Sequence, residues 1–407
     1  MDILACRTII EKALRGQEAA MLALLKELVD IDSPTDCAEG VRRVGQVCAD
    51  WLAKEGFSTA CLPHAPVPED EAWQADLATA WTARHGAEGA GPGIGFIGHM
   101  DTVFPVGTAR RRPFTVDRQA DRVYGPGVAD MKGGLVAMLF AARTLAAHKL
   151  LPCPLTLMFS SDEELGSPTS SQALRTHLRG AHAVFCAEPG GVGGRVTLSR
   201  KGSGHMHIRV QGVAAHAGRD YANGASAILA LARKVLAYDS LVDLPNGITV
   251  NTGLISGGTS ANSVAPWAEA RLHLTYRRLA DGERVVESIR RMTAEESLPH
   301  TRATASGGLR LYPLERTAAG DRLFDLVQEA GRLLDMPLEG QHYESAAESG
   351  FCSSVLGIPT ICCMGPEGEH IHSDKEYMVL SSLVPRAMLL ALSAVMAART
   401  DFSSPAA

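Results

Sequence analysis

The sequence has no excess of positive charge. Its 39 Lys and Arg residues stand against 45 Asp and Glu residues in a chain of 407, which gives a formal net charge of −6. Surfaces that bind the phosphates of DNA or RNA need clustered Lys and Arg. A short basic run, Arg110-Arg111-Arg112, is interpreted as a solvated loop. We therefore expect no nucleic-acid partner.

Other signals are lacking as well. No run approaches the roughly 18 uninterrupted apolar residues that a membrane-spanning helix needs. The segment from Met1 to Arg15 lacks the basic, apolar and small-residue order of a signal peptide. The 9 cysteines show no C-x-x-C spacing, and Cys362 and Cys363 lie within an apolar run, where cysteine behaves as a small buried hydrophobic residue. We expect reduced thiols, a cytoplasmic protein and no membrane partner.

The composition is that of a globular protein. With 46% hydrophobic and 21% charged residues, the chain is large enough for one large domain or two moderate ones. Apolar runs typical of buried strands occur at residues 94–97, 155–159, 183–186 and 359–364, and a helical pattern covers Gly133–Ala147. This alternation predicts an α/β domain whose ligands gather beyond the carboxyl ends of the strands. Residues 62–92, rich in Pro, Ala and Gly, are interpreted as a surface excursion.

The middle of the chain has a different hydrophobic pattern. Residues 205–210 and 271–276 alternate like antiparallel strands that are exposed on one face, and residues 225–236 and 283–295 have helical patterns. Candidate metal ligands resume after this region. We therefore predict a small α+β domain at 200–307, acting as a lid, inserted into a discontinuous catalytic domain of residues 1–199 and 308–407.

Side chains that bind metals follow the expected strands. His99 and Asp101, two residues apart, point to the same side, and a carboxylate often fixes the tautomer of a metal-bound imidazole. Asp130 follows a glycine-rich turn into a helix, where it could equally be a helix cap. Glu163 and Glu164 follow the next strand, and could equally form a solvated acidic loop.

Glu188 and His372 repeat this pattern near two further strand ends. Carboxylates and imidazoles without a thiolate suit zinc in a catalytic site. Carboxylates can also bridge the paired metal ions of hydrolases. Each motif alone is weak evidence, but their order along the chain indicates a metal-dependent hydrolase.

Six motifs resemble those of the M20 metallopeptidase family, with most likeness to its glutamate carboxypeptidase (carboxypeptidase G2) and acetylornithine deacetylase branches. They are Gly98-His99-Met100-Asp101-Thr102-Val103, the glycine-rich run 125–134, Asp162-Glu163-Glu164-Leu165-Gly166-Ser167, Ala187-Glu188-Pro189, Ala215-His216-Ala217-Gly218 and His372-Ser373-Asp374-Lys375-Glu376-Tyr377. The resemblance covers about residues 90 to 390. It implies a zinc-peptidase domain with a mixed central sheet flanked by helices, interrupted by a lid and dimerisation domain.

The resemblance also implies two Zn²⁺ ions per chain, with Co²⁺ or Mn²⁺ as substitutes. The implied ligands are Asp130 as the bridge, His99 and Glu188 at one ion, and Glu164 and His372 at the other. His370 is a rival to His372, which we prefer because the residues after it follow the family pattern.

Three further residues receive catalytic roles from the resemblance. Glu163 would be the general base, and Asp101 would orient His99. His216, on the insert, would donate to the developing oxyanion. In this family that histidine can reach the site of a neighbouring subunit, which implies a homodimer joined through the insert.

The substrate contacts depart from the family pattern. Asn262 matches a substrate-contacting position, but could equally be a turn residue. The Arg that reads a substrate α-carboxylate in the glutamate carboxypeptidase branch is Thr275 here, and a hydroxyl cannot replace a guanidinium clamp. Either the substrate lacks that carboxylate or a nearby arginine compensates, namely Arg200, Arg271 or Arg277. Glu348 would face an amine or hydroxyl of the substrate, or pair with an Arg.

The predicted activity is hydrolysis of an amide bond in a small-molecule substrate, an N-acyl amino acid or small peptide, by a carboxypeptidase or aminoacylase. An alternative is deacylation of an amine-bearing or carboxylate-free metabolite. A catalytically inactive binding protein is disfavoured because every expected ligand and Glu163 are present. An aminopeptidase of a related dizinc clan should lack the insert that carries His216.

Overall fold

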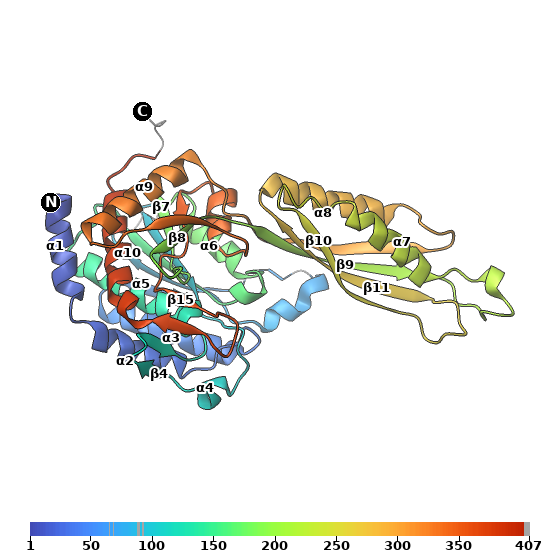
Figure 1. Cartoon of the computed structure of the whole chain (residues 1–407), viewed down its shortest axis with the longest axis horizontal. Helices are drawn as coiled ribbons and strands as arrows, with labels where there is room; N and C mark the ends of the chain where they lie inside the picture. Colours follow the sequence, from blue (N-terminus) through green and yellow to red (C-terminus); the bar gives the residue numbers. More distant parts are fainter. Residues whose placement is uncertain (65, 68, 88–89, 92, 403–407) are drawn as a thin grey trace. The chain divides into compact units, whose positions relative to one another are not determined.

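The computed structural model describes residues 1–64, 66–67, 69–87, 90–91 and 93–402, which fold as two units (Figure 1). Unit 1 comprises Met1–Ser199, Glu315–Tyr343 and Glu348–Ala407, and unit 2 comprises Arg200–Leu314 and Glu344–Ala347. The predicted end of the insert at 307 falls inside a strand that continues to Leu311. Unit 2 therefore extends several residues beyond the predicted boundary.

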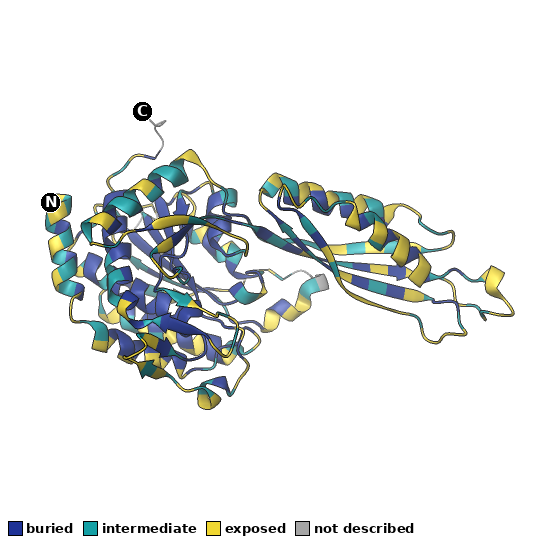
Figure 2. Ribbon diagram, viewed as in Figure 1, coloured by how far each residue is buried: buried dark blue, intermediate teal, exposed yellow. Residues whose placement is uncertain are grey.

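Unit 1 is built on a mixed sheet of 6 strands in the order β1-β2-β6-β3-β7-β14. The strands are β1 (Ser58–Cys61), β2 (Trp81–His85), β3 (Ile94–His99), β6 (Leu155–Ser160), β7 (Ala183–Cys186) and β14 (Thr360–Ile361). The last four of the order run parallel, and β1 and β2 are antiparallel to their neighbours. Every residue of β3, β6 and β7 is buried (Figure 2), which explains why these strands are continuous apolar runs in the sequence.

Helices pack around this sheet, and the predicted α/β class is confirmed (Figure 1). They are α1 (Ile3–Leu14), α2 (Glu18–Val29), α3 (Ala38–Lys54), α4 (Thr108–Arg111), α5 (Gly133–Ala147), α6 (Ser170–Leu178), α9 (Ala318–Leu333) and α10 (Leu383–Ala397). Short helical turns add η1 (Glu69–Asp76), η2 (Val128–Lys132), η3 (Glu163–Leu165), η5 (Phe351–Val355) and η6 (Leu380–Ser382).

One helix of the described chain has the length and apolarity to cross a membrane. It spans Leu380–Ala397, with a mean hydropathy of 1.7, and 78% of it is buried within the protein. It packs against α1, α5 and α9. Its apolar character is therefore accounted for by its place in the core of unit 1.

The predicted surface excursion at 62–92 is wrong for part of its length. β2 lies between β1 and β6 in the main sheet, and its residues Trp81 and Ala83 are buried. The residues at 65, 68, 88–89 and 92 lie outside the described part of the chain.

Two smaller antiparallel sheets complete unit 1. One has the order β15-β16-β5-β4, and the other pairs β13 with β8. Their strands are β4 (Thr115–Asp117), β5 (Arg122–Tyr124), β8 (Arg195–Arg200), β13 (Glu339–Tyr343), β15 (Gly368–Glu369) and β16 (Tyr377–Val379). The first of these sheets pairs Tyr124 with Tyr377, and so brings together two loops that are about 250 residues apart in the sequence.

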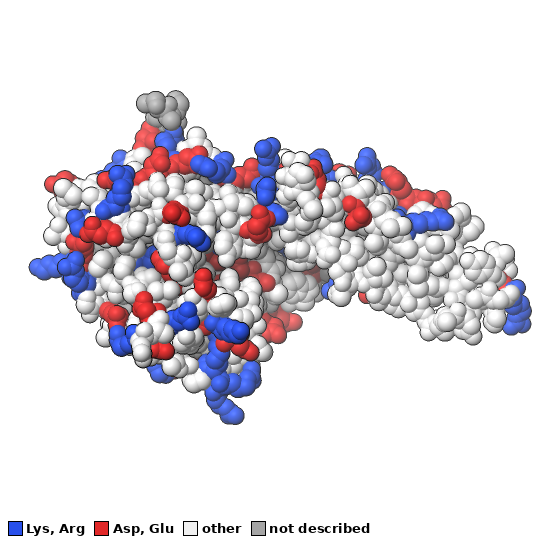
Figure 3. Space-filling view, in the orientation of Figure 1, with Lys and Arg blue, Asp and Glu red and all other residues white. Residues whose placement is uncertain are grey.

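Unit 2 is an antiparallel sheet in the order β10-β11-β9-β12, with two helices packed on one face. Its elements are β9 (Gly202–Gln211), β10 (Thr249–Gly257), β11 (Trp267–Tyr276), β12 (Arg302–Leu311), α7 (Ala227–Asp239), α8 (Leu279–Ala294) and the turn η4 (Tyr221–Asn223). The predicted α+β composition is present, but the sequence indicated the two central strands and missed both edge strands. On the face of the molecule shown in Figure 3, acidic and basic side chains are interspersed.

Candidate metal centre

The carboxyl ends of the parallel strands carry most of the predicted site. His99 is the last residue of β3, Glu163 and Glu164 lie on η3 just after β6, and Glu188 follows β7. Because these three strands are neighbours in the sheet, their ends meet at one edge. The side chains of His99, Glu163 and Glu188 are buried.

Asp130 lies between two histidines. Its Oδ1 is 3.1 Å from His99 Nε2, and its Oδ2 is 3.1 Å from His372 Nε2. Glu188 Oε1 is 3.5 Å from His99 Nε2, and Glu164 Oε2 is 3.2 Å from His372 Nε2. The donor atoms form two groups that share Asp130, and within each group they lie within 4.8 Å of one another. His370, the rival to His372, is in neither group.

His99 is oriented by Asp101. Its Nδ1 lies 3.0 Å from the backbone carbonyl oxygen of Asp101 and 3.3 Å from the carboxylate. Since these oxygens can only accept, Nδ1 carries the proton and Nε2 offers its lone pair to the site. The same carboxylate accepts hydrogen bonds from the backbone N–H groups of Glu163 and Glu164, at 3.2 and 3.1 Å. Asp101 thus holds two parts of the site together.

The electrostatics of these residues are those of a site that needs cations. Burial raises the pKa of Glu163 well above its ordinary value, and raises the pKa of Glu164 to about 7. Burial also disfavours charge on Asp130, yet hydrogen bonds from His372 and His99 lower its pKa. Hydrogen bonds to Asp130 and Glu164 raise the pKa of His372 to about 10. A metal ion bound here would neutralise the carboxylates that the two histidines face.

The donor set suits two divalent metal ions. It consists of two imidazole nitrogens and three carboxylates without a thiolate, a combination found in catalytic zinc sites. Glu164 Oε1 is buried and has no hydrogen-bond partner in the described part of the chain. A buried carboxylate oxygen left in this way is readily explained as a metal ligand, since burying it unpaired is costly.

A residue without a predicted role, Glu376, supports this centre. It is fully buried and accepts hydrogen bonds from the backbone N–H groups of Gly127, Ala129 and Asp130, at 3.1, 2.9 and 3.1 Å. Burial raises the pKa of Glu376 to about 7, and these three hydrogen bonds work against the rise. Glu376 follows the predicted motif at His372, but its partners lie on a distant loop, so sequence spacing gave no signal for the contact.

Comparison with known proteins identifies the family. Residues 95–395, well over half of the chain, match the model of the family described as Peptidase family M20/M25/M40. The chain belongs to family M20. The predicted resemblance is therefore confirmed, and the protein is a metal-dependent hydrolase that acts on amide bonds.

Individual M20 relatives agree with this assignment. The chain is 24% identical to carboxypeptidase G2 of Pseudomonas sp. (strain RS-16), over 95% of this chain and 91% of the relative. It is 31% identical to acetylornithine deacetylase of Edwardsiella ictaluri (strain 93-146), over 74% of this chain and 79% of the relative. The crystal structure of aminopeptidase PepT from Bacillus cereus ATCC 10987 superposes with a TM-score of 0.72 at 20% identity, covering 94% of this chain and 99% of that one.

The remaining predicted residues of this M20 protein lie mostly in unit 2. His216 is exposed, and its Nδ1 accepts hydrogen bonds from the backbone N–H groups of Gly218 and Arg219, at 3.2 and 3.1 Å. Its Nε2 therefore carries the proton. Asn262 is also exposed, and its backbone carbonyl oxygen accepts a hydrogen bond from the backbone N–H of Ala217 at 3.0 Å. The loops that carry His216 and Asn262 are thus paired directly.

Two of the three arginines proposed to compensate for Thr275 have partners on one loop of unit 2. Arg277 Nη2 lies 3.2 Å from Glu344 Oε1, and Arg200 Nη1 donates to Ser345 Oγ and to the carbonyl oxygen of Ala346, at 3.2 and 3.0 Å. The hydroxyls of Thr275 and Thr249 are 2.7 Å apart. The third arginine, Arg271, is exposed on the same face of β11 as Thr275, four residues away along the strand.

Glu348 lies in unit 1 and is almost completely buried, at 2% exposure. Its Oε1 accepts a hydrogen bond from Ser167 Oγ at 2.6 Å. Burial raises the pKa of Glu348 to about 8. The expected pairing of Glu348 with an arginine does not occur in the described part of the chain, where Ser167 donates to the carboxylate instead.

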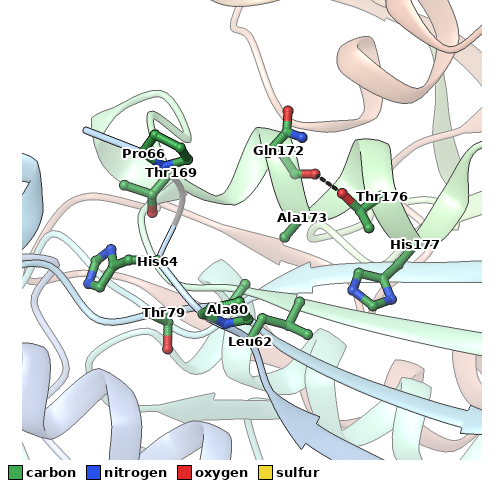
Figure 4. Close-up of a pocket in the computed structure, with 11 residues that line it drawn as sticks. Leu62, His64, Pro66, Thr79, Ala80, Thr169, Gln172, Ala173, Thr176 and His177 are labelled. Carbon is green, nitrogen blue, oxygen red and sulfur yellow. Dashed lines mark hydrogen bonds between the residues drawn. The ribbon is translucent and has the colours of Figure 1, made fainter. Parts of the chain in front are cut away.

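A separate pocket opens beside α6, and none of the candidate ligands lines it (Figure 4). Figure 4 shows side chains of α6 on one side and residues flanking β1 and β2 on the other. The pocket is lined by Leu62, Pro63, His64, Pro66, Thr79, Ala80, Thr169, Gln172, Ala173, Thr176 and His177. Thr169 also donates to Asp162 Oδ2 at 2.7 Å, so the pocket adjoins the segment that leads into Glu163.

Proposed function

We propose that this M20 hydrolase uses two divalent metal ions, Zn²⁺ by the chemistry of its donors, to cleave the amide bond of an N-acyl amino acid or small peptide. The observation that carries the proposal is the position of Asp130, whose two oxygens each face a histidine Nε2 at 3.1 Å. One carboxylate shared between two donor groups is the arrangement that bridged metal pairs require.

The residues of unit 1 would share the work as follows. Asp130, His99 and Glu188 would hold one ion, and Asp130, Glu164 and His372 would hold the other. When bound, the ions polarise the scissile carbonyl and make a water molecule more acidic. Glu163 accepts the proton of that water and delivers it to the leaving amine nitrogen. Its raised pKa, caused by burial, suits it to hold this proton between the two steps.

His216 would supply the donor for the negative charge that develops on the carbonyl oxygen. The two backbone hydrogen bonds to its Nδ1 support this role because they leave Nε2 protonated in the neutral imidazole. A fixed neutral donor stabilises an oxyanion without having to be protonated first. Asn262, on the paired loop, would contact the substrate beside it.

A second candidate substrate class is favoured by Thr275. Two of the arginines expected to compensate for it, Arg277 and Arg200, are engaged by residues 344–346. Arg271 is left as the candidate carboxylate contact, at four residues from the expected position. The enzyme would then favour an acylated amine or diamino acid over a substrate that is held by a plain α-carboxylate.

A panel of amides separates these classes. It would hold N-acyl glutamates, neutral dipeptides, acyl amines without a carboxylate and acyl diamino acids, with release measured by mass spectrometry before chelation, after chelation and after Zn²⁺ is restored. Zinc-dependent release from carboxylate-bearing members supports the N-acyl amino acid class, and Arg271→Met should then raise KM. Release only from the other members supports the second class. Release that persists in the fully metal-free protein would contradict the metal mechanism.

We further propose that the enzyme is a cytoplasmic homodimer joined through unit 2. Free cysteines in the described chain, with no disulfide among them, are compatible with a reducing compartment. β10 is an edge strand of the unit 2 sheet, and its Leu254 and Ile255 are 65% and 60% exposed. An exposed apolar edge strand is normally covered by a partner.

A further inference from the structure

Arg112 was interpreted from the sequence as part of a solvated basic loop. Arg110 and Arg111 are indeed exposed, but the Arg112 side chain is only 18% exposed. Its guanidinium lies over the ring of Phe104, 4.7 Å from the ring centre. Arg112 therefore differs from its two neighbours, and its contacts lead to the metal centre.

The guanidinium of Arg112 joins two loops. Nη2 donates to the carbonyl oxygen of Gly125 at 2.7 Å, at the start of the loop that carries Asp130. Nη1 donates to the carbonyl oxygen of Ser373 at 3.0 Å, directly after His372. Nη2 also lies 3.4 Å from Glu376 Oε2. One side chain thus holds the backbone on both sides of the gap between Asp130 and His372.

The His372 loop needs such an anchor. His370 and His372 both have positive φ, at 59° and 61°, a conformation that residues other than glycine adopt at a cost. The His372 side chain is 51% exposed, so few neighbours pack against it. The Asp130 loop, in contrast, is buried and is already held by three backbone hydrogen bonds to Glu376.

The backbone at Arg112 is fixed as well. It follows α4, whose start is tied to Asp32 through hydrogen bonds from the backbone N–H of Gly107 and Ala109, at 2.6 and 2.8 Å. The planar fork of an arginine can bond two carbonyl oxygens in different directions at once, which the single ammonium of a lysine does less well.

We propose that Arg112 is a positioning residue that couples the Asp130 loop to the His372 loop, and so sets the affinity for the metal ion held by Asp130, Glu164 and His372. This inference rests on the proposed two-metal function. The other ion would depend less on Arg112, because two of its three ligands lie at the ends of buried strands, His99 on β3 and Glu188 just after β7.

The test compares Zn²⁺ binding by the wild type, Arg112→Met and Arg112→Lys. Each protein would be dialysed against buffers of fixed free Zn²⁺, and bound zinc per chain measured by mass spectrometry. In Arg112→Met we expect the ion held by Asp130, His99 and Glu188 to bind within about threefold of wild type. The second ion, held by Asp130, Glu164 and His372, should bind about 10–100-fold more weakly, the usual effect of losing a contact that orients a ligand. The affinity of Arg112→Lys for the second ion should lie between those of the wild type and Arg112→Met.

Two controls show where the effect arises. Arg118→Met removes an exposed arginine that pairs with Glu18 on the surface of unit 1, and should bind both ions normally. His372→Ala should lose the second ion, and adding Arg112→Met to it should weaken the remaining ion no further, because both changes act on one site. If Arg112→Met does not fold, as judged by circular dichroism, Arg112→Lys carries the comparison.

Each outcome is decisive. Equal weakening of both ions, or unchanged binding of both in Arg112→Met and Arg112→Lys, overturns the role of Arg112 while leaving the two-metal centre standing. A wild-type protein that binds no Zn²⁺ overturns the proposed function itself. Selective loss of the second ion, with thermal unfolding of the metal-free variant close to wild type, supports the coupling.

Discussion

At the scale of single residues, Glu163 and Glu164 show how neighbours in sequence can have separate tasks. Glu164 faces His372 at 3.2 Å, whereas Glu163 is in neither ligand group. Glu163→Gln should therefore keep both metal ions and lower kcat by about 10²–10⁴-fold, the usual contribution of a general base. Glu164→Gln should instead lose zinc. Metal analysis alongside kcat checks both, and a Glu163→Gln variant that turns over normally would assign the base elsewhere.

Glu348 should make the stability of the protein depend on pH. Burial raises its pKa to about 8, above the unfolded value of about 4.3, so the folded state holds a proton that the unfolded state has released between these pH values. The contribution of Glu348 to the free energy of unfolding of the metal-free protein should then be fully present at low pH and be lost as the pH rises towards 8. Glu348→Gln cannot ionise at this position. Between pH 5 and 8 its free energy of unfolding should therefore fall by about 1 kcal/mol or more less than that of the wild type.

Urea unfolding of the chelated proteins at several pH values measures this difference. Glu39→Gln, on the exposed side of α3, is the matched control and should follow the wild type. Parallel curves for wild type and Glu348→Gln would mean that Glu348 is already ionised in the folded protein.

At the scale of elements, the close packing of α5 against the end of β7 places Asp130 near Glu188. A Cβ atom on Gly134 would lie 2.0 Å from the carbonyl oxygen of Ala187. Gly134→Ala should therefore destabilise the protein by about 2–4 kcal/mol, in the upper range for an overpacked core, and weaken zinc binding. Gly320→Ala, also in a helix but meeting only Thr317 Oγ1 at 3.2 Å, should change stability by less than about 1 kcal/mol. Equal effects of the two changes on the urea midpoint would contradict this account.

Elements also show what could be predicted from the sequence. β3, β6 and β7 are buried on both faces, so their residues form apolar runs, and the site residues directly after them could be located. β10 and β12 are edge strands with mixed polar and glycine residues, and β12 pairs with β9, which lies about 90 residues earlier in the sequence. The contacts of Arg112 and Glu376 with the Asp130 loop depend on the small β5–β16 pairing. No local pattern encodes such contacts, so they became visible only in the structure.

At the scale of the whole molecule, the exposed edge of unit 2 predicts assembly. Wild type should have twice the chain mass of 43.2 kDa in solution, as measured by light scattering. Leu254→Lys should disrupt the β10 edge and give a monomer, because a charge on an edge strand opposes pairing. Leu4→Lys changes an equally exposed leucine on α1 and should remain dimeric. A monomeric wild type at micromolar concentration would contradict the dimer.

If the dimer forms, the role of His216 can be assigned to one subunit or the other. Glu163→Gln and His216→Ala chains should each be inactive as homodimers. In a mixed dimer, one site combines an intact Glu163 with the intact His216 of the partner chain, if the histidine acts across the interface. Random mixing of equal amounts should then restore roughly a quarter of wild-type activity, since half the dimers are mixed and each has one complete site. If His216 acts within its own chain, mixing restores nothing, because neither chain holds both residues. Leu254→Lys adds the matching control, since chains that cannot pair should show no recovery.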